Sequence, residues 1–216
     1  MGSLYWQIND VWPSISWASI DHSGRWKLLH YAARRFFAPQ IVTAERGDNE
    51  TRVTLVSDAT KPVAARWTLT GYAMDGTKLG SAGGDVTLAA TTASAPHVVR
   101  DATVFGSAPL TASYAVATLS IGEAIVSRQI VERAEPKDMA YPAPGIRLAW
   151  DGNTVTLTAT RLARAVMLDF GELDAHPSDN GFDLLPGESR RITVTAKADG
   201  SALAKALVVR TLAGGA

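Results

Sequence analysis

The spacing of apolar residues from Ile41 onward restricts the fold most, because the pattern repeats at every second residue. The clearest examples are residues 51–57 and 65–72. Alternation of this kind places one face of a strand in a core and the other in solvent. Further strands are expected at 86–88, 97–105, 113–119 and 124–132, with a hairpin turn at Asp75-Gly76. The number and short spacing of these strands predict an all-β sandwich over residues 41–134, called here the middle sandwich.

A second set of strands follows a proline-rich stretch. Residues 135–145 contain Pro136, Pro142 and Pro144 among small and charged residues, a composition that predicts a linker. Beyond it, strands are expected at 146–150, 154–160, 165–170, 182–185, 190–196 and 206–212. Residues 146–216 are therefore predicted to form a smaller, C-terminal sandwich. A domain of about seventy residues is marginally stable alone, so we expect it to pack on its neighbour.

Residues 1–40 differ in composition from the rest of the chain. They hold eight of the sixteen aromatic residues. Residues 4–8 favour a strand, and a helix is expected from residue 24 or 25, with Asp21 or Ser23 as its N-cap. The expected apolar face of that helix consists of Trp26, Leu29, Ala33, Phe36 and Phe37. A strand, a loop and a helix cannot bury their own surfaces, so this segment is predicted to be the end of a larger fold.

Polar and aromatic residues cluster where the first predicted strand ends. Trp6 lies within that strand, and Asn9, Asp10 and Trp12 follow it directly. Aromatic rings pack on the C–H face of a pyranose, while amides and carboxylates bind its hydroxyls. Trp6, Asn9, Asp10 and Trp12 are therefore the predicted sugar-binding residues. Spacing alone leaves open the alternative that Tyr5, Trp6 and Trp12 are core aromatics.

The sequence contains no pattern typical of a metal, cofactor or nucleophile site. Four histidines are scattered without metal-ligand spacing and cysteine is absent, so neither a metal nor a cofactor is expected. G-x-S-x-G, P-loop and dinucleotide glycine motifs are also missing. Retaining glycoside hydrolysis needs two carboxyl groups about 5–5.5 Å apart. Residues 1–40 offer only Asp10 and Asp21, and Asp21 suits a helix cap better, so no catalytic residue is assigned.

Charge and hydropathy argue against nucleic-acid and membrane partners. Lysine plus arginine equals aspartate plus glutamate at 21 each, which leaves no global field to attract an anionic partner. No run approaches the roughly 20 apolar residues that span a bilayer. Met1-Gly2-Ser3 lacks the basic region of a signal peptide, so any export signal would lie outside the chain. The lack of cysteine excludes disulfides without identifying the compartment.

Four stretches carry a resemblance to β-mannosidases of glycoside hydrolase family 2. Residues 4–13, 16–21 and 24–39 resemble the end of the catalytic barrel, the first of them reading Leu4-Tyr5-Trp6-Gln7-Ile8-Asn9-Asp10-Val11-Trp12-Pro13. The run from Ser178 to Glu188, which begins Ser178-Asp179-Asn180-Gly181-Phe182, is similar to the signature of that family's last immunoglobulin-like domain. Order and spacing agree along the whole chain, with the middle sandwich supported mainly by its position.

The resemblance implies a mainly β fold, with two immunoglobulin-like β-sandwiches preceded by a β-loop-α remnant of a (β/α)₈ barrel. The remnant would be residues 1–40, the sandwiches 41–134 and 146–216, and the linker 135–145. In this family one glutamate after strand four and another at the end of strand seven carry the reaction. Both would lie upstream, so the chain alone is expected to be inactive and Met1 to be an internal methionine of a longer enzyme.

The resemblance also implies site residues and a substrate. By position, Trp6 resembles the strand-eight tryptophan of the −1 sugar subsite, and Asn9, Asp10 and Trp12 would lie at the same face of the barrel. The parent enzyme would hydrolyse terminal β-mannosyl residues of an oligosaccharide or glycoconjugate without a cofactor. A periplasmic or secreted location is favoured for it. Sister activities of the family, namely β-glucuronidase, β-galactosidase and exo-glucosaminidase, share the barrel.

The sequence leaves two other classes of function open. The chain could be a stand-alone carbohydrate-binding β-sandwich protein, or a structural scaffold that contacts no sugar. Without a barrel, Trp6, Trp26, Leu29 and Phe36 would face water. We therefore expect residues 1–40 either to be poorly ordered or to pack against the middle sandwich or against another copy. Self-association through the exposed barrel remnant is the partner interaction that this predicts.

Overall fold

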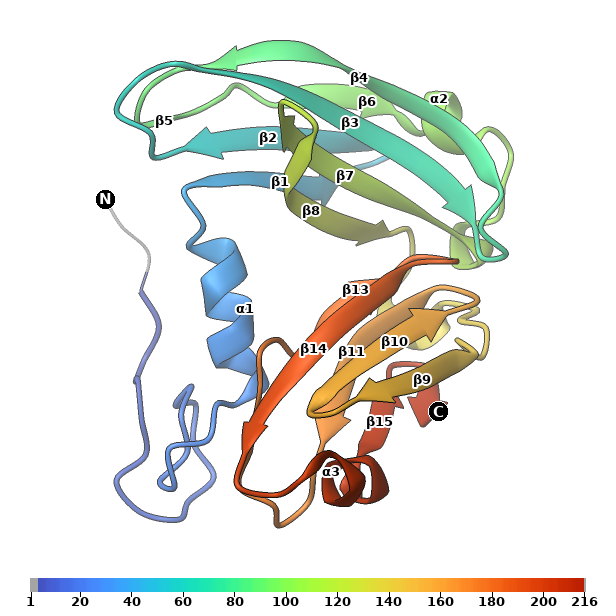
Figure 1. Ribbon diagram of the computed structural model, residues 1–216. Helices are drawn as coiled ribbons and strands as arrows, with labels where there is room; N and C mark the ends of the chain where they lie inside the picture. Colours follow the sequence, from blue (N-terminus) through green and yellow to red (C-terminus); the bar gives the residue numbers. More distant parts are fainter. Residues whose placement is uncertain (1–3, 216) are drawn as a thin grey trace. The chain divides into compact units, whose positions relative to one another are not determined.

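The computed structural model describes residues 4–215, and the chain divides into two compact units (Figure 1). One unit is continuous and spans Arg35–Tyr141, whereas the other combines the residues up to Arg34 with those from Pro142 onward. The sequence instead predicts residues 1–40 and the C-terminal sandwich as separate domains. The expectation about Met1 and Gly2 lies outside the described residues.

Residues 4–27 are an irregular, folded-back segment in which the predicted strand at 4–8 is not formed. Isolated bridges join Asn9 to Ile20 and Ile20 to Trp26. The Ile20 amide donates to the Ile8 carbonyl at 2.9 Å, and the Asp10 amide donates to the Ile20 carbonyl at 3.0 Å. A strand needs partners along its edges to satisfy its backbone groups, and here the segment satisfies some of them by folding back on itself.

Helix α1 (Leu28–Phe36) begins later than predicted. Asp21 does not cap it but closes a turn ahead of it, accepting hydrogen bonds from the amides of Ser23 and Arg25 at 2.8 and 2.9 Å. The buried residues of the helix are Tyr31 and Ala33. The predicted apolar face is therefore wrong in part, since Trp26, Phe36 and Phe37 are each at least 44% exposed.

The unit of Arg35–Tyr141 is a sandwich of two antiparallel four-stranded sheets (Figure 1). One sheet has the order β1-β2-β5, with β6 also paired to β2, and the other has the order β4-β3-β7-β8. The strands are β1 (Gln40–Arg46), β2 (Glu50–Ser57), β3 (Val63–Ala73), β4 (Lys78–Leu88), β5 (Thr92–Ala93), β6 (His97–Arg100), β7 (Ser113–Ile121) and β8 (Ala124–Glu132). Alternate residues of facing strands, among them Leu55, Leu69 and Leu119, form the core.

Close backbone packing in this sandwich replaces part of a predicted strand by a helix. Residues 97–105 were expected to be one strand, but β6 ends at Arg100 and α2 (Asp101–Phe105) follows. A β-carbon on Gly71 would lie 2.2 Å from the Val104 carbonyl oxygen, and one on Gly80 2.4 Å from that of Thr103. The two glycines thus leave room for α2 to lie against β3 and β4. Two 3-10 helices, η1 (Leu110–Ala112) and η2 (Pro136–Asp138), complete the unit.

The C-terminal sandwich is also built from two antiparallel sheets, in the orders β12-β14-β10-β9 and β13-β11-β15-β16. Its elements are β9 (Ile146–Asp151), β10 (Thr154–Ala159), β11 (Ala163–Asp169), β12 (Ala175–Pro177), β13 (Phe182–Leu184), β14 (Ser189–Ala196), α3 (Gly200–Ala206), β15 (Val208–Thr211) and β16 (Gly214–Gly215). Helix α3 takes the start of the strand predicted at 206–212, and Asp199 caps it by accepting from the Ala202 amide at 2.9 Å. The mainly β fold with two sandwiches is thus confirmed. No helix within residues 4–215 has the length and apolar character needed to cross a bilayer.

Candidate functional site

Asp10 is the one predicted binding residue whose side chain is buried, at 3% exposure. Its Oδ2 accepts from Lys27 Nζ at 2.6 Å, and its Oδ1 accepts from the Ser16 hydroxyl. The hydrogen bonds from Lys27 and Ser16 hold the pKa of Asp10 below its usual range. Both carboxylate oxygens are therefore engaged within the protein, and Asp10 ties its own loop to the residue just before α1.

The other three predicted residues face solvent. The side chains of Trp6 and Trp12 are each 68% exposed, and so is that of Trp17 on the same segment. Asn9 is exposed as well, and its Nδ2 donates to the Asp10 carbonyl at 3.3 Å. Trp6 and Trp12 are thus not core aromatics in this structure. Their rings are available to a ligand on a segment that Asp10 holds from inside.

Ser19 is a fully buried residue of this segment that sequence reasoning missed. Its hydroxyl donates to the Ile8 carbonyl at 3.0 Å, and Tyr5 Oη and His30 Nδ1 lie 3.1 and 3.0 Å from it. Because a hydroxyl has a single hydrogen, the Tyr5 hydroxyl and His30 Nδ1 must then both donate to it, so that His30 carries a proton on Nδ1. Ser19 joins the chain near Trp6 to α1. A small polar residue within the apolar piece Trp17-Ala18-Ser19-Ile20 was the available signal.

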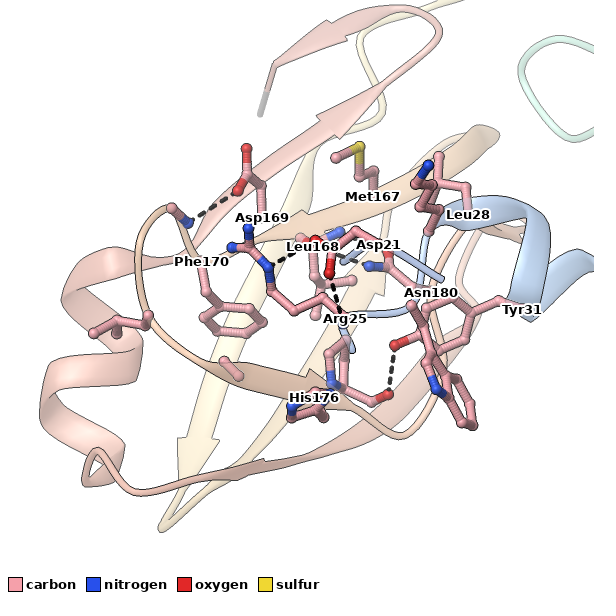
Figure 2. Close-up of a pocket in the computed structure, with 16 residues that line it drawn as sticks. Asp21, Arg25, Leu28, Tyr31, Met167, Leu168, Asp169, Phe170, His176 and Asn180 are labelled. Atoms are coloured by element: carbon pink, nitrogen blue, oxygen red, sulfur yellow. Dashed lines mark hydrogen bonds and ion pairs between the residues drawn. The ribbon is translucent and has the colours of Figure 1, made fainter. Parts of the chain in front are cut away.

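Helix α1 packs on the C-terminal sandwich. The Tyr31 hydroxyl, on a ring only 2% exposed, donates to the Pro177 carbonyl at 3.0 Å (Figure 2). Arg34 pairs with Asp179 at 2.8 Å and donates to the Ser178 carbonyl at 3.1 Å. Burial, and secondarily the charge of Asp179, raises the pKa of Tyr31. The expectation that this segment would pack on the middle sandwich is therefore corrected for Tyr31 and Arg34, whose hydrogen bonds and ion pair described here go to residues 177–179.

The run that begins at Ser178 provides the other side of this contact. Asp179 has an oxygen 2.6 Å from Arg190 on β14, in addition to its pair with Arg34. The Asn180 carboxamide accepts from the Leu168 amide at 2.8 Å and donates to the Leu168 carbonyl at 3.0 Å. The polar residues of this run therefore hold the loop between β12 and β13 to the sandwich and to α1.

A pocket of about 190 Å³ lies beside this contact, between residues 21–31 and 167–180 (Figure 2). Arg25, Tyr31 and His176 are among its lining residues. Burial works to raise the pKa of Asp21 at its rim, but hydrogen bonds from the Arg25 and Ser23 amides and the Arg25 side chain outweigh it and lower that pKa. None of the four predicted sugar-binding residues lines the pocket. Within residues 4–215, no group of three or more His, Asp or Glu side chains could hold a metal ion.

Family comparisons match both sandwiches. The family described as "Mannosidase Ig/CBM-like domain" matches residues 49–138, and the mannosidase "Ig-fold domain" matches residues 141–214. A protein named β-mannosidase A from Aspergillus clavatus is 30% identical over 213 residues, which cover 89% of this chain and 23% of that protein. The mouse protein named β-mannosidase is 51% identical over 61 residues, 28% of this chain and 7% of that one.

Solved structures share the fold. The β-D-mannosidase of Dictyoglomus thermophilum aligns with a TM-score of 0.77 at 18% identity, covering 95% of this chain and 25% of that chain. The exo-chitosanase CsxA of Amycolatopsis orientalis aligns with a TM-score of 0.65 at 19% identity, covering 98% and 30%. The chain thus spans about a quarter of the length of these proteins, 23% for the A. clavatus relative. The two matched mannosidase domains and the similarity to β-mannosidase A over 89% of this chain show that the chain belongs to glycoside hydrolase family 2, as a C-terminal part of the β-mannosidase type.

Proposed function

We propose that this chain is the C-terminal region of a retaining β-mannosidase, in which residues 4–34 form one wall of the sugar site and the two sandwiches act as accessory domains. The observation that carries the proposal is the pair Trp6 and Trp12. Both rings are 68% exposed on a segment that is fixed from within by the buried residues Asp10 and Ser19. An exposed aromatic surface on a fixed backbone suits a sugar face, because little ordering entropy is lost on binding.

The four predicted residues then have two kinds of role. Trp6 and Trp12 pack against sugar rings, and the exposed Asn9 amide bonds a hydroxyl. Asp10 does not contact sugar in this proposal, since both of its oxygens already accept hydrogen bonds from Lys27 and Ser16. Its role is to hold the loop on which Asn9 and Trp12 lie.

The catalytic carboxylates are proposed to lie outside these 216 residues. A retaining glycosidase uses one carboxyl group as nucleophile and another, with a raised pKa, as general acid. In residues 4–34 the carboxyl groups are those of Asp10 and Asp21. Each is paired with a cation and has a lowered pKa, so both stay ionised at neutral pH. Neither can serve as the proton donor, and we assign both glutamates to other parts of a longer protein.

Two measurements on the purified chain test this proposal. Hydrolysis of an aryl β-mannoside should be undetectable, and turnover by the chain itself would contradict the placement of the carboxylates. Binding of mannobiose, followed by the indole N–H resonances in NMR, should be weak, with a dissociation constant on the order of 1 mM, because one wall supplies few contacts. Trp6→Ala and Trp12→Ala should abolish the shifts, whereas Trp17→Ala, an equally exposed tryptophan of the same segment, should not.

A carbohydrate-binding role for the middle sandwich is the second candidate. The description "Mannosidase Ig/CBM-like domain" over residues 49–138 favours it. Calorimetric titration of the chain with manno-oligosaccharides, before and after deletion of residues 1–40, separates the two candidates. Micromolar affinity that survives the deletion supports the binding module, and loss of binding supports the sugar-site wall.

The proposed function also implies the partners of this chain. The β-mannoside of an oligosaccharide or glycoconjugate binds through the longer enzyme, and this segment adds only part of its contacts. Exposed apolar side chains at Leu4, Val11 and Ile15 also leave self-association as a prediction for the chain alone. Light scattering over a range of protein concentrations measures it directly.

A further inference from the structure

We propose that Asp179 is a positioning residue. It anchors α1 to the C-terminal sandwich, and α1 in turn fixes the segment that carries Trp6 and Trp12. The statement that this segment binds sugar rests on the proposed function above. The anchoring of the segment rests on contacts between residues of one compact unit.

Asp179 is a bridge between two arginines that are far apart in the sequence. Its side chain is 7% exposed, with one oxygen 2.8 Å from Arg34 on α1 and the other 2.6 Å from Arg190 on β14. Arg190 is fixed to the sandwich, because its guanidinium lies 4.7 Å from the centre of the Phe182 ring. Removal of either guanidinium would leave this buried carboxylate incompletely paired, which is strongly destabilising. Asp179 therefore couples the end of α1 to the C-terminal sandwich.

The second contact of α1 fixes its rotation. Tyr31 and Arg34 are three residues apart and so lie on the same face of the helix. The Tyr31 hydroxyl reaches the Pro177 carbonyl at 3.0 Å while Arg34 reaches Asp179 at 2.8 Å. With two anchors on one face, the helix can neither roll nor slide along its axis without breaking one of them. Its N-terminal turn is thereby held at a defined place.

That N-terminal turn carries the contacts to the sugar-site segment. His30 Nδ1 lies 3.0 Å from the Ser19 hydroxyl, and the Lys27 amide donates to the Ser19 carbonyl at 2.8 Å. The Lys27 ammonium pairs with Asp10 at 2.6 Å. Ser19 in turn bonds the Ile8 carbonyl, two residues after Trp6. Any displacement of α1 must therefore move or break the contacts that flank Trp6 and Trp12.

The sandwich itself does not depend on this bridge for its core. Its buried cluster, which includes Leu157, Ile192 and Leu203, is formed by residues of the C-terminal sandwich alone. Arg34 lies outside that cluster, and 52% of its side chain is exposed. Removal of the bridge should therefore loosen residues 4–27 selectively and leave the strands of the sandwich protected from exchange.

Amide hydrogen exchange of the 216-residue chain tests the proposal with Asp179→Asn and a control, Asp151→Asn. Asp151 is an exposed carboxylate of the same sandwich, 3.7 Å from Arg191. The reporting amides are those of Asp10 and Ile20, which bond within residues 4–27, and those of Val155 and Ile192 in the sandwich core. In Asp179→Asn, exchange of Asp10 and Ile20 should accelerate at least tenfold, with Val155 and Ile192 unchanged. Asp151→Asn should alter neither pair, and Asp179→Glu, which keeps the charge, should restore most of the protection.

Unchanged exchange at Asp10 and Ile20 in Asp179→Asn overturns the proposal. If Asp179→Asn accelerates exchange equally in the core, Arg34→Gln decides instead, because Arg34 is not part of the sandwich. Selective acceleration in Arg34→Gln supports the proposal, and either no change or uniform acceleration contradicts it. None of these readouts involves a sugar. A failure of the sugar-site assignment, seen in the mannobiose titration, is therefore separate from a failure of this inference.

Discussion

Two buried tyrosines should respond in opposite ways to the same substitution by phenylalanine. The hydroxyl of Tyr31 donates to the Pro177 carbonyl at 3.0 Å. The hydroxyl of Tyr114, on a fully buried side chain of β7, has no hydrogen-bond partner among the described residues. Removal of a hydroxyl that is bonded leaves a buried carbonyl unsatisfied, whereas removal of an unpartnered one relieves a desolvation penalty.

The size of each effect follows from these surroundings. Tyr31→Phe orphans the carbonyl of the buried residue Pro177, which should cost about 1–3 kcal/mol of unfolding free energy. With a urea m-value of about 1.5–2 kcal/mol/M, the midpoint of its unit should fall by roughly 0.5–2 M. Tyr114→Phe should be neutral or stabilise its unit by up to about 1 kcal/mol.

The pH dependence of the unfolding free energy is a second, independent test. Burial raises the pKa of both tyrosines above the ordinary value of 10. Above pH 10 the unfolded chain releases these protons while the folded chain keeps them, so stability is present below pH 10 and is lost as the pH rises through the raised values. The slope is at most about 1.4 kcal/mol per pH unit for each tyrosine. Tyr114→Phe should flatten this loss for the unit of Arg35–Tyr141.

Pulsed hydrogen exchange at increasing urea concentration, read by mass spectrometry, measures the two units separately. Peptides from β14 report the unit that contains Tyr31, and peptides from β7 report the other. A Tyr31→Phe variant with an unchanged midpoint for β14, or a Tyr114→Phe variant with a lower midpoint for β7, would refute the reasoning from hydrogen-bond partners.

Three further predictions concern single contacts. The pKa of Asp10 is lowered by its hydrogen bonds to Lys27 and Ser16, so its contribution to stability is present above pH 3.8 and is lost as the pH falls through the lowered value. Protection of the Asp10 and Ile20 amides from hydrogen exchange should fall there, and at pH 7 in Lys27→Met. Gly71→Ala, with its new carbon 2.2 Å from a carbonyl oxygen, should lose about 1–3 kcal/mol in urea unfolding, whereas Gly84→Ala, with no atom within 4 Å, should be tolerated. Arg133 pairs with Asp101 at 3.5 Å, with side chains 9% and 14% exposed, so Arg133→Met leaves a buried carboxylate unpaired. It should cost about 3–5 kcal/mol and lower the melting temperature of the unit Arg35–Tyr141 by more than about 10 °C.

The sequence predicted the strands well wherever their pattern is local. Period-two alternation placed β2, β3, β7 and β8 to within two residues, because a strand buried on one face has an apolar residue at every second position. It failed where backbones approach each other closely. Helix α2 exists because Gly71 and Gly80 of other strands leave space for it, and nothing within residues 97–105 records that.

The candidate site was predicted in composition but not in its internal contacts. The cluster of Trp6, Asn9, Asp10 and Trp12 is visible in the sequence, since Trp6 lies within a strand-favouring run and the other three follow it directly. The pairing of Asp10 with Lys27 depends on a fold-back of the chain, across 17 residues. The bond from Tyr31 to Pro177 spans 146 residues, and no periodicity can indicate a contact at that distance.

The same bond has a consequence for synthesis of the protein on the ribosome. Tyr31 and its acceptor are 146 residues apart, which at about 5–20 residues per second corresponds to roughly 7–30 s of translation. Throughout that interval α1 has emerged but the loop that anchors it has not, while the whole of Arg35–Tyr141 can fold. Within this chain the tryptophan-rich segment is thus made first, and its anchor on the C-terminal sandwich forms only after Pro177 has been made.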